Sequence, residues 1–171
     1  MDYQDQRTIY GKSMFNILLK SSRFLMKHMW LYYLLNYTWG ILTTLTGWCV
    51  YLILKLFLNK KLKKCGKFGP CHYLIFGNNW GGLEMGVNFF VADNMGESWT
   101  LHTKQHETGH TFQNAILGPF AIILVFIPSA VRYWYQRLSK KTQKPYDAIW
   151  FEGEASAAGL EFYTNYLGGE K

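Results

Sequence analysis

Three histidines spaced four residues apart stand in the stretch TLHTKQHETGHTFQNAILGPF, which begins at Thr100. On a helix, residues four apart share one face, with their Cβ atoms about 5–6 Å apart. His106 and His110 could therefore bind one divalent ion at zinc–nitrogen distances of about 2.0–2.1 Å. Glu107 lies one position further round the helix, where it could take a proton from water at the open position of the metal. These are the roles of an H-E-x-x-H motif, and they predict a zinc site with Glu107 as its catalytic base.

The remaining histidine of the stretch, His102, lies eight residues before His110, or about 12 Å along a helix axis. It cannot complete a three-histidine site from the same helix. We expect it to end the preceding strand or turn, or to support the metal ligands from outside; Gln113 and Ser156 are further candidates for that supporting role. Gly109 in the middle of this helix costs about 1 kcal/mol relative to Ala, so another segment should pack closely over it.

A third ligand is available in YDAIWFEGEASAAGLEFY, where Glu152 and Glu154 stand at the head of a predicted helix. Steps of three, four, seven and eleven residues from Glu152 give an uncharged, mostly small face that can lie over Gly109, made of Ala155, Ser156, Gly159 and Tyr163. The same steps from Glu154 reach a second charge at Glu161, which favours a face turned toward water. We therefore predict that Glu152 binds zinc and that Glu154, the alternative ligand, lies at the rim.

The two motifs together resemble those of integral membrane zinc proteases of the Glu-zincin type, which pair H-E-x-x-H with a downstream E-x-x-A-D helix. HETGH and EGEASAAG carry this resemblance. WGGLEMGVNFF, HETGHTFQNAILGP and IPS are more closely similar to small bacterial membrane proteins with H-E-x-G-H-T-x-Q and L-G-P motifs. The resemblance implies that His106, His110 and Glu152 are ligands and that Glu107 is the base. Ser156 stands where the family has an aspartate that orients a ligand histidine, a departure that could weaken metal affinity or activity.

These residues predict a membrane-associated zinc metallopeptidase that hydrolyses peptide bonds near the lipid surface, through a zinc-bound water activated by Glu107. Its substrate would be a peptide or a segment of a membrane protein. The strand near 86–92 could pair with that substrate in an extended conformation. The alternative is a catalytically silent, metal-stabilised membrane protein that acts by binding a partner. The polar residues around the motif favour a site at the membrane edge over one inside an apolar helix.

The composition is that of a protein in contact with lipid. Aromatic residues make up 18% of the 171 residues and charged residues only 17%, whereas a soluble domain has about 25% charged residues. The net charge of +7 could indicate nucleic-acid binding, but the basic residues cluster at the edges of apolar runs, as in KLFLNKKLKKCGK. That arrangement favours anionic lipid headgroups as the partner and argues against nucleic acid. No feature indicates an oligomeric state.

Two apolar segments are candidates for membrane contact. No charged residue occurs between Lys27 and Lys55, and a helix through Met29–Leu54 would be about 40 Å long, enough to span a bilayer with some tilt. The preceding SMFNILLKSSRFLMKHMW has the spacing of an interfacial amphipathic helix. The second run, 115–131, contains Pro119, which should end or kink the helix before it, so the run is either a broken membrane helix or a re-entrant segment. Basic residues flank both runs, which leaves the orientation open.

We expect a mainly α-helical fold with a small β-hairpin, in which a membrane helix adjoins a two-helix, zincin-like metal site. Residues 1–58 would form the amphipathic and membrane helices, and residues 59–171 the metal-site region with its second apolar segment. Within that region, HYLIF and GVNFFVA have the composition of short strands joined by the turn-forming GNNWGGLEMG. Cys65 and Cys71 could form a disulfide or remain free thiols. The sequence thus predicts an integral membrane protein built around one metal site.

Overall fold

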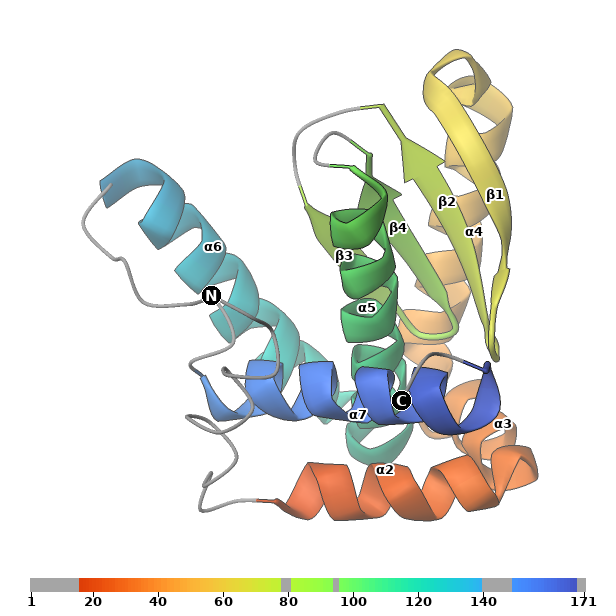
Figure 1. The fold of residues 1–171 in the computed structure, drawn as a ribbon, viewed down its shortest axis with the longest axis vertical. Coiled ribbons are helices and arrows are strands. Elements are labelled where there is room, and N and C mark those ends of the chain that lie inside the picture. Colours follow the sequence, from red (N-terminus) through yellow and green to blue (C-terminus); the bar gives the residue numbers. More distant parts are fainter. Residues whose placement is uncertain (1–15, 78–80, 94–95, 140–148, 169–171) are drawn as a thin grey trace.

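The structure is a computed structural model that describes residues 16–77, 81–93, 96–139 and 149–168. Helices dominate these residues, and a four-stranded sheet lies among them (Figure 1). The helices are α2 (Ile17–Lys27), α3 (Met29–Tyr37), α4 (Ile41–Phe57), the 3₁₀ turn η1 (Asn59–Lys61), α5 (Glu97–Leu117), the π-helix η2 (Ile122–Phe126), α6 (Ile127–Ser139) and α7 (Trp150–Tyr166). The strands are β1 (Leu62–Phe68), β2 (Cys71–Phe76), β3 (Gly82–Met85) and β4 (Asn88–Ala92). The predicted mainly helical fold is confirmed.

The sheet is mixed, and the predicted hairpin of HYLIF and GVNFFVA is wrong. These segments form β2 and β4, which lie side by side in parallel register with His72 opposite Asn88. The antiparallel pairs are β1 with β2 and β3 with β4, so the strand order is β1-β2-β4-β3. The cause is the connection: Gly82–Met85, predicted as part of a turn, is strand β3, and the chain reverses after it at Gly86, whose φ is 68°. Because β4 is an interior strand, it cannot pair with a substrate as predicted.

Helices cover both faces of the sheet, with α4 behind it and α5 in front of it in Figure 1. Side chains alternate between the two faces along each strand. Phe90 packs with Tyr51 of α4 on one face. Tyr73 and Phe89 pack on the other face, in a cluster that includes Trp99 of α5. The helix that carries H-E-x-x-H is therefore held against the sheet along its N-terminal half.

The C-terminal helix α7 runs across α5, and α2 lies along α7 (Figure 1). Phe112 of α5 and Phe162 of α7 share a buried cluster with Leu25 and Tyr32 from the N-terminal helices, so residues 1–58 and 59–171 contribute to one core. The predicted amphipathic helix is α2, although residues 13–15 of the predicted segment lie outside the described residues. Its apolar face is occupied by this packing within the protein.

The predicted continuous helix over Met29–Leu54 is wrong, because it is broken into α3 and α4, which are bent by 83° relative to each other. The break surrounds Asn114 of α5, whose amide donates to Asn36 Oδ1 over 2.8 Å and accepts from Thr43 Oγ1 over 2.6 Å. A Cβ at Gly40 would lie 2.8 Å from the same amide. Polar groups bonded across three helices hold the bend. Within the described residues, no single helix has the length and hydropathy to cross a bilayer, and α3 with α4 passes only as a bent pair.

Pro119 follows the end of α5, as predicted. The helix stops at Leu117, and Gly118 turns the chain with a φ of 56°. The chain then continues into η2 and α6. The apolar run 115–131 is thus divided among α5, η2 and α6, and no continuous helix passes through it.

The three cysteines are free thiols. Cys65 is exposed on β1, whereas Cys71 on β2 is buried and lies 3.4 Å from the hydroxyl of Thr111. The disulfide between Cys65 and Cys71 that the sequence left open is therefore not formed.

Candidate metal centre and its cavity

The candidate site lies where α5 and α7 cross with their backbones almost in contact. Gly109 of α5 has no room for a side chain, because a Cβ there would meet the carbonyl oxygen of Ala155. Gly159 of α7 likewise faces the carbonyl oxygen of Gln105. Only glycine permits this approach at both positions. The prediction that the small face of α7 lies over Gly109 is confirmed.

Three potential ligand atoms converge at this crossing. His110 Nε2 lies 3.1 Å from His106 Nε2 and 3.0 Å from Glu152 Oε2, and His106 Nε2 lies 3.1 Å from the same carboxylate oxygen. All three residues are buried. Among the described residues they are the one group of three or more His, Cys, Asp or Glu side chains that could hold a metal ion. The structure therefore brings together the three residues that the sequence selected.

The spacing and chemistry of these atoms fit a metal ion. Atoms bound to a tetrahedral zinc at about 2.0–2.1 Å lie about 3.3 Å from one another, close to the 3.0–3.1 Å separations found here. Two imidazole nitrogens and a carboxylate oxygen form a donor set that zinc accepts. Glu152 is completely buried, and its Oε1 has no hydrogen-bond partner among the described residues. A carboxylate in that position needs positive charge beside it.

Hydrogen bonds fix the ring orientation of both histidines. Gln113 donates from Nε2 to the carbonyl oxygen of Phe151 over 2.7 Å, which leaves its Oε1 as the acceptor 2.8 Å from His110 Nδ1. His110 must then carry a proton on Nδ1, so that a neutral ring presents the lone pair of Nε2 to the site. His106 Nδ1 lies 2.7 Å from Ser156 Oγ. Gln113 and Ser156 thus occupy positions from which side chains orient metal-binding histidines.

The charges of the three groups stabilise one another. Burial would lower the pKa of His110, but the charge and hydrogen bond of Glu152 raise it to about 10. Burial also lowers the pKa of His106, and Glu152 again produces a net rise. For Glu152, burial would raise the pKa, yet the two histidines hold it well below its ordinary value. The carboxylate is therefore matched with positive charge at the ring nitrogens, where a divalent cation can replace the protons.

Glu107 faces β3 and is separate from the group of ligand atoms. Its carboxylate fills the space that a side chain at Gly82 would occupy, next to the methyl group of Thr103. Burial raises the pKa of Glu107 more than the charges of His106 and His110 lower it. A carboxylate with a raised pKa beside a metal-binding group is suited to accepting and returning a proton.

A cavity of about 970 Å³ opens beside these residues, between α4, β3, α5, η2 and α6. The wall formed by η2 is apolar, with Ile122, Val125 and Phe126, and α4 adds Leu42 beside two threonines. The α5 wall is polar and contributes His102, His106, Glu107, His110 and Gln113. Of the candidate ligands, His106 and His110 are therefore accessible to a molecule that enters the cavity.

The cavity wall carries a further carboxylate that sequence reasoning missed. Glu84 of β3 lines the cavity, and its Oε1 is buried without a hydrogen-bond partner among the described residues. Burial raises the pKa of Glu84 to about 8, although the charge of His110 acts in the opposite direction. The signal was present in WGGLEMG, because Gly82 and Glu84 stand two positions apart and share a face of a strand. Because sequence reasoning assigned this stretch to a turn, Glu84 was not recognised as a candidate site residue.

Two predicted site residues lie elsewhere than expected. His102 does not end a strand or turn, because it is inside α5, one turn before His106. Its ring stacks on that of His106 with centroids 6.4 Å apart, a contact compatible with the alternative expectation that it supports a ligand. Glu154 is buried and not at a rim, and its Oε2 accepts the backbone N–H of Leu19 over 2.9 Å at the start of α2. The physical reason is that the first N–H groups of a helix have no partner within it. Neither residue belongs to the group that could hold a metal.

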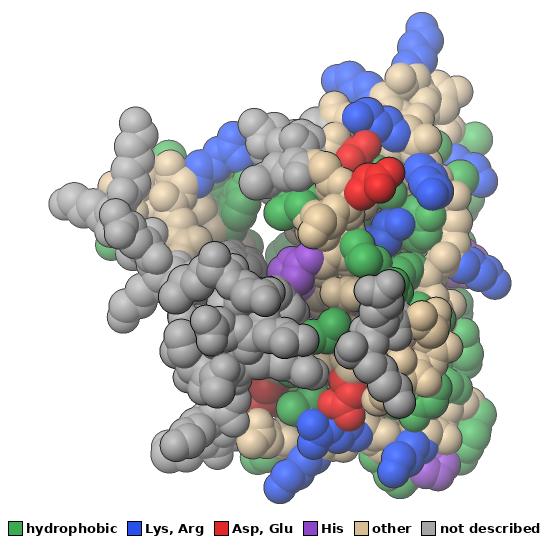
Figure 2. All heavy atoms as spheres, viewed as in Figure 1, with side chains coloured by type: hydrophobic (Ala, Val, Ile, Leu, Met, Phe, Trp, Pro, Cys, Tyr) green, Lys and Arg blue, Asp and Glu red, His purple; other side chains and the backbone are tan. Residues whose placement is uncertain are grey.

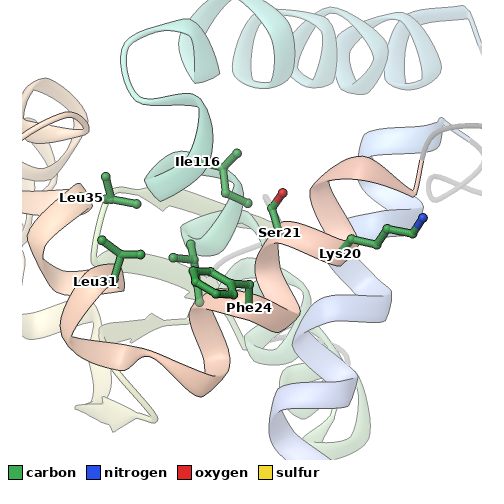
Figure 3. Close-up of a pocket in the computed structure, with 7 residues that line it drawn as sticks. Lys20, Ser21, Phe24, Leu31, Leu35 and Ile116 are labelled. Carbon is green, nitrogen blue, oxygen red and sulfur yellow. The ribbon is translucent and has the colours of Figure 1, made fainter.

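A second, smaller pocket of about 430 Å³ lies between α2, α3 and the end of α5 (Figure 3). Phe24, Leu31, Leu35 and Ile116 point toward one another there, while the ammonium group of Lys20 points away from them. It offers no cluster of reactive side chains, so the chemistry of the described residues concentrates at the α5–α7 crossing.

Comparison with known proteins identifies no relative. No protein-family model matches the chain, and no curated protein or solved structure is significantly similar to it. The chemistry of the site is therefore argued from the geometry of α5, α7 and β3.

Proposed function

We propose that the protein is a membrane-associated zinc metallopeptidase. The observation that carries this proposal is the convergence of His106, His110 and Glu152 within 3.1 Å at the wall of a large cavity, with Glu107 beside them. Structural zinc sites are closed by four protein ligands, whereas catalytic sites keep one position open. Two of the three proposed ligands, His106 and His110, line the cavity, and an open position on that side favours catalysis over a structural role.

Zinc held by these three residues would lower the pKa of a water molecule and polarise a carbonyl group. The residues of the chain supply the remaining steps. Glu107 accepts a proton from the water that attacks the peptide carbonyl and returns it to the leaving amine. Gln113 and Ser156 keep the two imidazoles turned so that their Nε2 atoms face the site.

An extended peptide is the substrate that the cavity fits best. Strand β3 is the outer strand on its side of the sheet, and Gly82–Met85 lines the cavity. Among the described residues no strand pairs with the outer edge of β3. Such an edge can form backbone hydrogen bonds with an added strand, and a peptide bound there would pass in front of Glu107. The opposite walls present Leu42, Ile122 and Val125, which favours apolar residues in that peptide.

The proposed membrane location is supported by the outer faces of α4, η2 and α6. These carry exposed large apolar side chains that do not line the cavity: Leu45, Leu52, Ile53, Leu56, Phe57, Ile123, Leu124, Val131 and Leu138. Soluble monomers rarely expose apolar surface this extensive. Lys60 and Lys61 lie in the 3₁₀ turn η1 shortly after α4. Figure 2 shows Lys and Arg side chains along the side formed by β1, which favours anionic headgroups. Because α4 and α6 also line the cavity, a substrate segment could reach it from lipid.

The membrane proposal is tested by extraction. Carbonate or high salt should leave the protein with the membrane, and detergent should release it. Salt screens headgroup attraction but not apolar contact, so release by salt alone would contradict insertion and indicate a peripheral protein.

The peptidase proposal is tested by Glu107→Gln. The variant should keep about one zinc per chain, while hydrolysis of a peptide library falls by about 100-fold or more. Glu97→Gln, which removes an exposed carboxylate of the same helix, is the matched control and should remain active. Undiminished hydrolysis in Glu107→Gln would remove the mechanism. Zinc binding by a wild-type protein that cleaves nothing would favour the alternative of a metal-stabilised binding protein.

A further inference from the structure

Glu84 points from β3 toward the same side of the sheet as the metal-site helix. Strand side chains alternate, and Leu83 and Met85 pack in the cluster on the α4 side. Gly82 and Glu84 therefore face α5. The Glu107 carboxylate lies against Gly82, so this face of β3 packs beside the α5 wall of the cavity. Two carboxylates, Glu107 of α5 and Glu84 of β3, therefore line one cavity.

Close packing holds Glu84 in place. A Cβ at Gly47 of α4 would meet the carbonyl oxygen of Met85, and a Cβ at Gly86 would meet Thr44. The turn after Glu84 is thus in close contact with α4 at two positions, Met85 against Gly47 and Gly86 against Thr44. The backbone N–H of Gly86 also donates to the Glu84 carboxylate. The carboxylate has a fixed position before any ligand arrives, as a binding group requires.

One oxygen of this carboxylate is left without a partner. Oε1 is buried and makes no hydrogen bond to any described residue. The ion pairs of the described residues involve Glu161, Asp93 and Glu152, and none involves Glu84. A buried carboxylate without a cation is unfavourable; burial accordingly raises the pKa of Glu84 to about 8. A cationic ligand would reverse that effect.

We propose that Glu84 binds a primary ammonium group of the substrate. The inference rests on the proposed peptidase function only in naming the ligand as part of a substrate. A metal ion is a poorer candidate, because no group of three or more ligating residues in the described chain includes Glu84. A guanidinium pairs best with both oxygens of a carboxylate, and here the N–H of Gly86 already takes part of that capacity. A compact ammonium needs only the free oxygen.

The test uses heptylamine and heptan-1-ol as probes, titrated calorimetrically into zinc-loaded protein at neutral pH. Both probes fit apolar walls, but only the amine carries a charge, and its protonated nitrogen cannot bind zinc. Wild type should bind the amine about 10- to 100-fold more tightly than the alcohol, as expected for a hydrogen-bonded charge pair. Glu84→Gln should abolish this preference while alcohol binding and zinc content stay unchanged. Glu97→Gln, on an exposed carboxylate outside the cavity, should behave as wild type.

Equal binding of amine and alcohol by wild type overturns the proposal, as does a preference that survives in Glu84→Gln. Should Glu84→Gln fail to fold, Glu84→Asp replaces it, since it keeps the charge but withdraws it by one methylene. Glu84→Asp should show a reduced preference, and full retention there counts against the site.

Peptide arms distinguish the two sources of a primary ammonium. If wild type binds a peptide with a free amino terminus more tightly than its acetylated form, and Glu84→Gln does not, the site binds the amino terminus of the substrate. If wild type binds an acetylated peptide that contains lysine more tightly than an acetylated peptide without lysine, the site binds a lysine side chain. If no peptide is cleaved but the amine preference depends on Glu84, the peptidase proposal fails and the ammonium site stands.

Discussion

The two sides of α5 are built differently. Toward α7, each metal-site histidine contacts a side chain that orients it, and both lie within 3.1 Å of Glu152. Toward β3, Glu84 and Glu107 face a cavity, and burial raises the pKa of both. On the first side the chain itself supplies contacts for the nitrogens of both histidine rings, and Glu152 Oε1 is the oxygen that has no partner among the described residues. On the second side, burial disfavours the ionised form of both carboxylates, and a bound cation would stabilise that form. The proposed metal site and the proposed substrate site differ in this way.

The largest effect is expected from breaking the α7 side at Gly159. A valine there would drive its Cβ into the carbonyl oxygen of Gln105, which is backbone and cannot turn aside. Gly159→Val should cost about 3 kcal/mol or more of unfolding free energy, at the upper end for overpacking, and should release the metal. Thermal unfolding and metal analysis measure both. Ala157→Val, which adds volume at a partly exposed position of α7, is the control. Equal losses of stability and metal in the two variants would show that close packing at the α5–α7 crossing does not hold the site together.

A smaller effect is expected on the β3 side, from the titration of Glu84. Its pKa is about 8 in the folded chain and about 4.3 when unfolded. Between these values the folded protein holds the extra proton, so the contribution of Glu84 to stability falls as pH rises from about 4 to about 8. Glu84→Gln should lack this loss. Its Tm relative to wild type should therefore increase between pH 5 and pH 8.5, whereas that of Glu97→Gln should not. A flat difference for Glu84→Gln would mean that the carboxylate is ionised at little cost.

The sequence predicted the α7 side well because that side depends on local spacing. His106 and His110 are one turn apart, and the small face that starts at Glu152 matches Gly109 without reference to the rest of the fold. The β3 side could not be predicted in this way. The alternation of Gly82 and Glu84 can be read from WGGLEMG, but the position of β3 in the sheet also depends on the parallel pairing of β2 with β4, which no short-range pattern encodes.

The same limit explains the broken helix and the buried Glu154. The uncharged run after Lys27 predicts one long helix, but the amide of Asn114, far along the chain, bonds residues on both sides of the break. Glu154 was expected to face water because Glu161 shares its face. It is buried because α2 presents the N–H of Leu19 to it. In both cases a polar partner that is distant in sequence decides the outcome.

The central claim is that the α5–α7 crossing holds zinc through Glu152, and metal analysis of two purified variants tests it most directly. Glu152→Ala removes the oxygen that lies 3.0–3.1 Å from both histidine nitrogens. Glu154→Ala removes another buried carboxylate, two residues away, that bonds α2 instead. Wild type and Glu154→Ala should retain about one zinc per chain, with Glu154→Ala losing about 0.5–2 kcal/mol of stability, as for a lost helix cap. Glu152→Ala should retain almost none. Full zinc in Glu152→Ala, or its loss only in Glu154→Ala, would contradict the account.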